Sequence, residues 1–299
     1  MKVGITGASG FLGTAIIAEA RRKSWFVVAY SRDLNSDIEG AGEVRSLQDR
    51  EKIDFTGLDA LIHLAGEPIV GLWSKEKKRR IHESRVDLTE DIVECLAALN
   101  RSQRPPVFVS ASAVGFYGDR ADEELDEEAD LGFGFLSEVC RDWEATATQA
   151  TRLGIRVAIP RIGIVLGEQG FLKKVRPIFN IGLGGKLGKG DQWMSWVHIA
   201  DAARIFIECA ENSGIHGRVN CVAPEPVTNR EFTQVYANVL SRKAFLPVPA
   251  FVLKRLPGGM SSIFLDSQRA DPVVLKAFGF EWTYPDIDSA LRAVESGGA

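Results

Sequence analysis

The sequence contains little of what disulfide frameworks, metal centres and membrane spans require. Only four of its 299 residues are cysteines, and no two of them form a Cys-x-x-Cys pair, so neither a zinc site nor a redox pair is indicated. Isolated thiols of this kind are typical of a reducing compartment. No stretch approaches the roughly 20 uninterrupted apolar residues of a membrane-spanning helix, and the N-terminal residues carry no signal-peptide pattern. We therefore expect a cytoplasmic protein with no metal ion and no membrane partner.

An excess of positive charge is also missing. The chain has 36 lysine and arginine residues against 40 aspartate and glutamate residues, which gives a formal net charge of -4. A general nucleic-acid-binding protein needs a basic face that neutralises phosphates. No nucleic-acid partner is therefore expected, and a small molecule is the expected ligand. The composition is compatible with a monomer and with a homodimer.

Short apolar stretches alternate with helical patterns through the first half of the chain. The strand-like stretches lie at residues 3–5, 26–30, 60–64, 107–110 and 156–159. Alternating strands and helices predict a parallel sheet, and continuous apolar strands fit a sheet whose two faces are both covered by helices. The predicted fold class is α/β: a Rossmann-type, doubly wound parallel sheet over residues 1–165, to which some later strands return.

The pattern loosens in the second half of the chain. Residues 182–190 are rich in glycine, and five prolines interrupt short helical pieces between residues 246 and 299. Prolines at this density break both helices and strands. We expect a smaller, mixed C-terminal lobe over residues 166–299.

A glycine-rich loop follows the first strand-like stretch. Residues 6–13 read TGASGFLG and stand immediately before a helical pattern. In such a turn Gly7 permits the tight bend, Gly10 leaves room for pyrophosphate, and Gly13 lets the helix pack close to the sheet. The helix N-terminus then offers free N–H groups to the phosphates. The context predicts that residues 1–165 form a dinucleotide-binding domain with 166–299 as its substrate-side lobe; the alternative is a tight turn without a ligand.

The end of the second strand-like stretch bears on the choice between NAD and NADP. An NAD site usually places an acidic residue there, which binds the ribose 2′-hydroxyl, whereas this chain has Ser31 and Arg32. A guanidinium can hold a 2′-phosphate that a carboxylate would repel. Asp33 comes one residue later and is expected to point elsewhere. We therefore predict NADP as the cofactor; the alternative is that Arg32 is a solvated surface residue.

Several motifs resemble the extended, epimerase-like branch of the short-chain dehydrogenase/reductase superfamily. The TGASGFLG loop is similar to that branch's T-G-x-x-G-x-x-G, and HLAG at 63–66 is similar to its H-L-A-[AG] segment. The sequence SRVDLT at 84–89 stands where the family has an N-V-x-G-T helix, with Arg85 in place of the asparagine. WVHIAD at 196–201 is similar to a late family segment that precedes a helix.

A closer resemblance is to an atypical subgroup of this family, the YfcH-like proteins. It rests on LAGEPI at 64–69, CRDWE at 140–144, RIGIVLG at 161–167 and GLGG at 182–185. Residues 248–285 are similar to that subgroup's own C-terminal domain of unknown function. The resemblance implies that the cofactor is contacted by Gly7, Ser9, Gly10, Phe11, Leu12, Gly13, Ser31, Arg32, Leu64, Ala65, Gly66, Arg80, Arg85 and Val165.

The family's catalytic pair is missing. The superfamily uses a Tyr-x-x-x-Lys pair on a helix, in which the lysine lowers the pKa of the tyrosine and holds the ribose, and the tyrosine transfers a proton. The corresponding segment at 132–140 has neither residue, and Glu138 stands at about the lysine's place. The remaining catalytic candidates are Ser112, which matches the family's orienting serine, and Tyr117, whose phenol is expected to face the cleft; the alternative for Tyr117 is a packing role.

The resemblance implies an NADP(H)-binding, epimerase-like oxidoreductase that acts on a small molecule of unknown identity. The alternative is a non-catalytic NADP(H)-binding sensor or partner-binding scaffold, which the missing pair favours. His198 and Asp201 allow a further acid–base pair at helical spacing, but a histidine that holds a backbone group at a helix start is the preferred interpretation.

Overall fold

A parallel sheet forms the centre of the molecule. The computed structural model describes residues 1–255 and 257–297. The eight-stranded sheet has the order β12-β8-β5-β4-β1-β2-β3, with the short β6 also paired to β8, and its pairs are parallel. Its strands are β1 (Lys2–Thr6), β2 (Phe26–Ser31), β3 (Glu43–Ser46), β4 (Ala60–His63), β5 (Val107–Ser110), β6 (Ser112–Ala113), β8 (Arg156–Ile162) and β12 (Gly217–Cys221).

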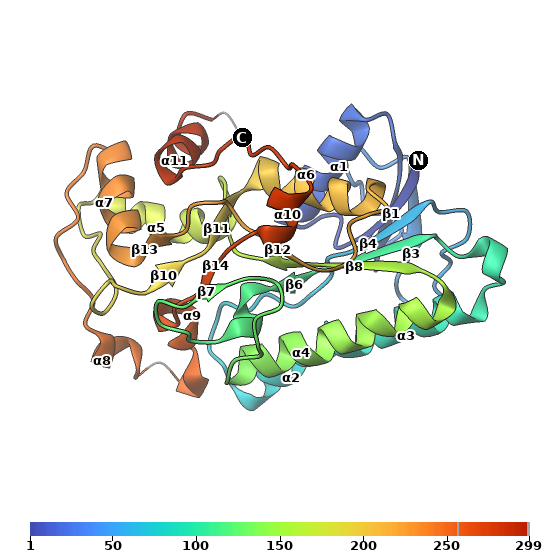
Figure 1. Cartoon of the computed structure of the whole chain (residues 1–299), viewed down its shortest axis with the longest axis horizontal. Coiled ribbons are helices and arrows are strands. Elements are labelled where there is room, and N and C mark those ends of the chain that lie inside the picture. The colour runs from blue at the N-terminus through green and yellow to red at the C-terminus, as the bar shows by residue number, and fades with distance from the viewer. Residues whose placement is uncertain (256, 298–299) are drawn as a thin grey trace.

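Helices cover both faces of this sheet. Figure 1 shows α1 (Phe11–Arg22) and α6 (Ile199–Glu211) on one side, and α3 (Val86–Ala98) and α4 (Phe135–Thr148) on the other. The short α2 (Lys75–Glu83) precedes α3. Side chains alternate along a strand, so each apolar strand contributes to two cores. This arrangement confirms the Rossmann-type α/β class.

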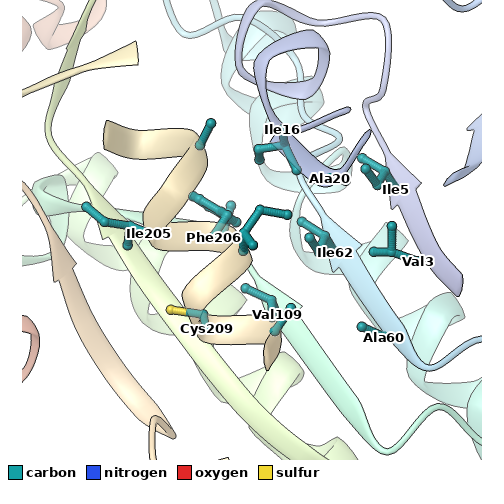
Figure 2. Close-up of a cluster of buried hydrophobic side chains, with 14 of the residues drawn as sticks. Val3, Ile5, Ile16, Ala20, Ala60, Ile62, Val109, Ile205, Phe206 and Cys209 are labelled. Carbon is teal, nitrogen blue, oxygen red and sulfur yellow. The ribbon is translucent and has the colours of Figure 1, made fainter. Parts of the chain in front are cut away.

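The first core lies between the sheet and the helix pair α1 and α6. Ile16 from α1 and Phe206 from α6 pack with Val3, Ile5 and Ile62 of the strands (Figure 2). The second core lies under α3 and α4, where Leu61 and Phe108 meet helical residues such as Ile92. Strand β12 and helix α6 belong to the later half of the chain, so residues beyond 165 complete both the edge of the sheet and one covering layer.

The remaining residues form a smaller lobe of mixed structure. Strands β9 (Ile164–Leu166) and β11 (Trp196–His198) are parallel, β10 (Trp193–Met194) and β13 (Val227–Thr228) are antiparallel, and β7 (Glu124–Leu125) and β14 (Arg269–Ala270) are parallel. The helices here are α5 (Gly170–Asn180), α7 (Asn229–Val239), α8 (Ala250–Leu253), α9 (Ser262–Leu265), α10 (Val273–Ala277) and α11 (Ile287–Glu295). A third apolar core joins α5, α7 and α11. The smaller, mixed lobe is as expected.

Four short 3-10 helices complete the secondary structure of the described residues. They are η1 (Arg101–Gln103), η2 (Val114–Tyr117), η3 (Gln149–Leu153) and η4 (Pro257–Gly259). Within residues 1–255 and 257–297, no helix combines the length and the apolar composition that crossing a bilayer requires.

The start of α6 anchors the C-terminal segment. The His198 ring accepts a hydrogen bond from the N–H of Ala200 at Nδ1, 3.2 Å away, and so caps the helix. Asp201 is fully buried, and its two carboxylate oxygens accept hydrogen bonds from the backbone N–H groups of Thr283 and Tyr284 at 2.9 Å. Both side chains therefore hold backbone, and the acid–base interpretation of this pair finds no support.

Candidate functional site

The glycine loop has a shape that only glycine allows. Gly7 adopts a φ of 70°, in the left-handed region that other residues rarely adopt. A Cβ on Gly7 would lie 2.9 Å from the backbone nitrogen of Ala65, and a Cβ on Gly13 would lie 2.3 Å from the Gly7 carbonyl oxygen. The loop is closed by a hydrogen bond of 3.0 Å from the N–H of Gly10 to the carbonyl of Gly7. Bare backbone therefore packs against bare backbone at the carboxyl end of β1.

The N-terminus of α1 is open to a ligand. Gly10 is the N-cap residue, no side chain caps the helix, and the first turn contains no acidic residue. Ser9 and Gly10 are exposed, whereas Phe11 and Leu12 are partly buried. The first N–H groups of a helix have no partner within the helix and carry a positive partial charge. This end of α1 can therefore bind an anionic group.

The ring of Phe11 connects this loop to the turn after β9. A Cβ on Gly167 would lie 2.5 Å from Cζ of Phe11, so glycine is needed there to accommodate the ring. Val165 lies two residues before this glycine, and a Cβ on Gly170 would meet both the Phe11 ring, at 3.4 Å, and the carbonyl oxygen of Val165, at 4.0 Å. The structure thus brings the predicted residue Val165 to the side of the glycine loop.

A buried threonine–histidine pair positions residues 64–66. The hydroxyl of Thr6 lies 2.6 Å from Nδ1 of His63 and accepts a hydrogen bond of 3.2 Å from the N–H of Leu64. The N–H of Ala65 lies 3.4 Å from the same oxygen. Burial, together with the charge of Arg85, lowers the pKa of His63 to about 3, so the ring that contacts the threonine is neutral. The pair holds the start of 64–66 beside the loop.

Arg32 stands at the tip of β2 without an acidic partner. Asp33 is committed to a local turn, because its Oδ1 accepts a hydrogen bond of 2.9 Å from the N–H of Asn35. Its own N–H donates to the hydroxyl of Ser31 at 3.1 Å. Arg32 is exposed and forms no hydrogen bond or ion pair with any described residue. The Arg32 guanidinium therefore has no counter-charge among its described hydrogen-bond and ion-pair contacts.

Arg85 and Arg80 differ in their surroundings. Arg85 is partly buried; its Nη1 donates to the carbonyl of Glu67 at 3.0 Å, and its guanidinium carbon lies 5.4 Å from the ring centre of Trp143. Arg80 is half exposed, with Nε 3.7 Å from the carboxylate of Glu67. A Cβ on Gly66 would lie 3.0 Å from the guanidinium carbon of Arg85. The structure places Arg85 directly beside the predicted segment 64–66 and leaves Arg80 on the surface.

Ser112 belongs to a buried polar network. Its hydroxyl donates to Oε1 of Glu144 at 2.6 Å. Arg161 donates to both oxygens of this carboxylate, from Nε and Nη2, at 2.9 Å each. The serine and the arginine are almost completely buried. The proton of Ser112 is therefore directed into the protein interior.

The position of Tyr117 corrects the expectation that its phenol faces a cleft. The side chain has no exposed surface. Its hydroxyl accepts a hydrogen bond from Nη1 of Arg161 at 2.9 Å and lies 2.7 Å from Oδ1 of Asn220. Burial raises the pKa of Tyr117 to about 12. A phenol that is enclosed and hydrogen-bonded on both sides is a structural group in this conformation.

The inner face of α4 carries neither a tyrosine nor a lysine at the spacing that the family uses. Leu136 and Cys140 are four residues apart and face Gly115: a Cβ on that glycine would lie 3.5 Å from Cβ of Leu136 and 4.0 Å from Sγ of Cys140. Glu138 is exposed on another face of the helix, so the expectation that it occupies the lysine's place is wrong. Burial raises the pKa of the Cys140 thiol to about 11, which keeps the thiol neutral.

Sequence reasoning missed the partners of this network. Glu144 and Arg161 form its centre, and Asn220 on β12 contributes an amide that donates to the backbone carbonyls of Leu125 and Asp271. One signal was present in the sequence. Arg161 follows the apolar residues 157–160 of strand β8, and a charged residue within a strand covered on both faces needs a buried partner.

Two protein-family models match this chain. The model of the NAD dependent epimerase/dehydratase family matches residues 3–222, and a domain of unknown function, DUF1731, matches residues 248–294. The chloroplastic epimerase family protein SDR39U1 homolog of Arabidopsis thaliana is 38% identical over 301 residues, covering 98% of this chain and 86% of the relative. Epimerase family protein YfhF of Bacillus subtilis is 33% identical over 295 residues, covering 97% of each chain.

A solved structure is similar over the same length. The crystal structure of human epimerase family protein SDR39U1 (isoform 2) with NADPH has a TM-score of 0.90 and 29% sequence identity to this chain. The similarity covers 99% of both chains. The likeness therefore includes the C-terminal lobe as well as the central sheet.

Proposed function

Because the chain belongs to the NAD dependent epimerase/dehydratase family, we propose that it binds NADP(H) at the glycine loop and acts as an epimerase-like oxidoreductase. This membership agrees with the resemblance of the sequence motifs to the atypical extended short-chain dehydrogenases/reductases. One observation carries the preference for NADP(H): the exposed guanidinium of Arg32 has no acidic partner among the described residues. Its charge and its planar donors complement a 2′-phosphate.

The cofactor fits the residues around the glycine loop. The bare backbone of the glycine loop and the uncapped start of α1 complement a pyrophosphate. The human relative with NADPH supports the same cofactor here. The proposed contacts are those of Gly7, Ser9, Gly10, Phe11, Leu12, Gly13, Ser31, Arg32, Leu64, Ala65, Gly66, Arg80, Arg85 and Val165. When bound, the nicotinamide supplies hydride chemistry for a small-molecule substrate.

Replacement of Arg32 tests the cofactor preference. The substitution Arg32→Asp removes the positive charge and introduces one that repels a 2′-phosphate. NADPH affinity should fall by about a hundredfold, the effect of losing a charge-assisted contact and gaining a repulsion. NADH lacks the 2′-phosphate, so its affinity should change much less. Isothermal titration with each dinucleotide measures both dissociation constants.

A matched control is available on α1. Arg22 is 74% exposed and pairs with Glu19 within the same helix, so Arg22→Asp changes the net charge equally without touching the loop. It should leave both affinities nearly unchanged. Equal weakening of NADPH and NADH by Arg32→Asp would overturn the NADP(H) assignment.

A non-catalytic NADP(H)-binding sensor or scaffold is the second candidate. It is favoured by the inner face of α4, where Leu136 and Cys140 stand at the spacing of the family's proton-transferring pair. The burial of Ser112 and Tyr117 in a structural network supports it further. Neither hydroxyl is available to a substrate in this conformation.

Isotope transfer separates the two candidates. Protein loaded with NADPH deuterated on the nicotinamide is incubated with a panel of aldehydes, ketones and keto-sugar nucleotides, each of which offers a carbonyl that can accept the deuteride. Deuterium found in any panel member would support the oxidoreductase and contradict the sensor. A sensor should instead transfer none, while NADPH and NADP+ raise its melting temperature to different extents.

We also propose that the protein is cytoplasmic. All four cysteines are buried and none forms a disulfide, which fits a reducing compartment. A thiol-reactive reagent should label the native protein slowly and the unfolded protein fully. The same labelling pattern is expected with and without a reductant, and a reductant-dependent increase would contradict the free-thiol state.

A further inference from the structure

Arg85 is a partly enclosed cation that lacks an acidic partner. Glu67 is the carboxylate whose charge reaches it, but that carboxylate is committed to Lys77, whose Nζ lies 2.6 Å from Oε1. Arg85 forms no ion pair within residues 1–255 and 257–297. An enclosed charge without a counter-charge is unfavourable, so an unpaired guanidinium of this kind points to a ligand.

The guanidinium of Arg85 has donors to spare. Nη1 donates to the backbone carbonyls of Glu67 and Ile81, at 3.0 Å and 3.3 Å. Nε and Nη2 donate to no acceptor in the described part of the chain. The backbone carbonyls thus fix one edge of the planar group, and two N–H-bearing nitrogens remain for an external acceptor.

Gly66 opens the cofactor side of this guanidinium. A Cβ on Gly66 would lie 3.0 Å from its central carbon and 3.2 Å from both terminal nitrogens. Gly66 is exposed, and the preceding residue Ala65 borders Gly7 of the glycine loop. The absence of a side chain at Gly66 therefore leaves the guanidinium next to the surface on which the dinucleotide is proposed to lie.

The same guanidinium reaches the inner face of α4. It lies over the ring of Trp143, and its charge acts on the Cys140 thiol. Helices α3 and α4 run side by side (Figure 1), so the start of α3 can deliver a charge to α4. Cys140 stands four residues after Leu136, at the spacing of the family's tyrosine and lysine. Its neutral thiol does not provide the positive charge that the lysine would.

We propose that Arg85 replaces the missing lysine, with Nε and Nη2 holding the ribose hydroxyls and the adjoining phosphate on the nicotinamide side of the cofactor. The inference rests on the proposed NADP(H) binding. A guanidinium presents several donors in a fixed plane, which suits two neighbouring oxygens. Burial lowers the pKa of Arg85, and a bound phosphate would offset that loss. The positive charge that the family's lysine supplies from α4 thus comes, in this protein, from Arg85 at the start of α3.

Three ligands of decreasing length show which part of the cofactor Arg85 contacts. NADPH contains both halves of the cofactor, 2′-phospho-ADP-ribose lacks only the nicotinamide, and 2′,5′-ADP lacks the second phosphate and ribose. Arg85→Gln should weaken NADPH and 2′-phospho-ADP-ribose by about ten- to hundredfold, the usual effect of losing hydrogen bonds from a charged group. The affinity for 2′,5′-ADP should stay within about twofold. Arg85→Lys should restore part of the lost affinity.

The control variant is Arg79→Gln. Arg79 lies on the neighbouring α2, is 59% exposed and pairs with Glu76 and Glu83, so all three affinities should be unchanged. Equal losses for the three ligands with Arg85→Gln would indicate a merely structural role and overturn the inference. Unchanged affinities would overturn it too. Failure of the wild-type protein to bind any of the three would instead contradict the proposed function, and the inference would fall with it.

Discussion

Arg161 donates two hydrogen bonds to Glu144, from Nε to Oε1 and from Nη2 to Oε2, each 2.9 Å long. The arginine has no exposed surface. The pair joins β8 of the central sheet to α4, and Ser112 donates to the same carboxylate. The two residues therefore fix the helix whose inner face borders the candidate site.

The first prediction concerns this ion pair. Glu144→Gln leaves the Arg161 guanidinium buried without a counter-charge, and removing one partner of a buried pair costs about 3–5 kcal/mol. The free energy of unfolding from urea denaturation should fall by that amount. The exposed pair of Asp288 and Arg292 on α11 provides the control: Asp288→Asn should cost less than about 0.5 kcal/mol. A Glu144→Gln protein as stable as the wild type would show that the pair is not formed.

The second prediction concerns Tyr117. Tyr117→Phe removes a buried hydroxyl that accepts from Arg161 and contacts Asn220, so the free energy of unfolding should fall by about 1–3 kcal/mol. The NADPH dissociation constant should not change, because the phenol is enclosed by Arg161, Asn220 and the carbonyl of Asp126. Loss of turnover without loss of stability would instead assign a catalytic role to this hydroxyl.

The third prediction concerns the glycine loop. Gly13→Ala would place a methyl group 2.3 Å from the carbonyl oxygen of Gly7, and backbone on both sides leaves no room to relax. NADPH binding should be lost, and the melting temperature should fall. Gly115→Ala is the matched control, because its Cβ would meet Leu136 at an ordinary 3.5 Å. Retention of NADPH affinity by Gly13→Ala would contradict the loop geometry.

The fourth prediction concerns pH. Burial lowers the pKa of His63 to about 3 and that of His198 to about 4, against an ordinary value near 6.5. Below pH 6.5 the unfolded chain binds protons at these two positions and the folded chain does not, so stability falls as the pH decreases toward the folded pKa values. Between pH 7 and pH 5 each histidine should remove about 2 kcal/mol.

Urea denaturation at both pH values measures this effect. His198→Asn can still cap the helix through its side-chain oxygen but does not titrate, so it should lose its share of the pH dependence. His216 is exposed, and His216→Asn should keep the full dependence. An unchanged slope in His198→Asn would mean that this histidine is not held neutral in the folded protein.

Local patterns in the sequence were sufficient for much of the fold and for part of the site. The apolar strands predict a sheet covered on both faces, and the observed cores on its two sides confirm it. The glycine spacing predicts the turn at Gly7 because the φ angle and the close backbone contacts are properties of neighbouring residues. The mixed C-terminal lobe followed from its prolines, although the pairing of its strands did not.

What the sequence by itself determined is therefore local: the strand-to-helix turn at 6–13, the charge of Arg32 and the absence of a Tyr-x-x-x-Lys pair. Tertiary structure decided which polar side chains are available. It enclosed Tyr117 between Arg161 and Asn220, and it brought Arg85 under Gly66. The physical reason is that a buried polar group takes its partners from whichever segment lies beside it in space. Asn220 is 103 residues from Tyr117, and no spacing in the sequence records that contact.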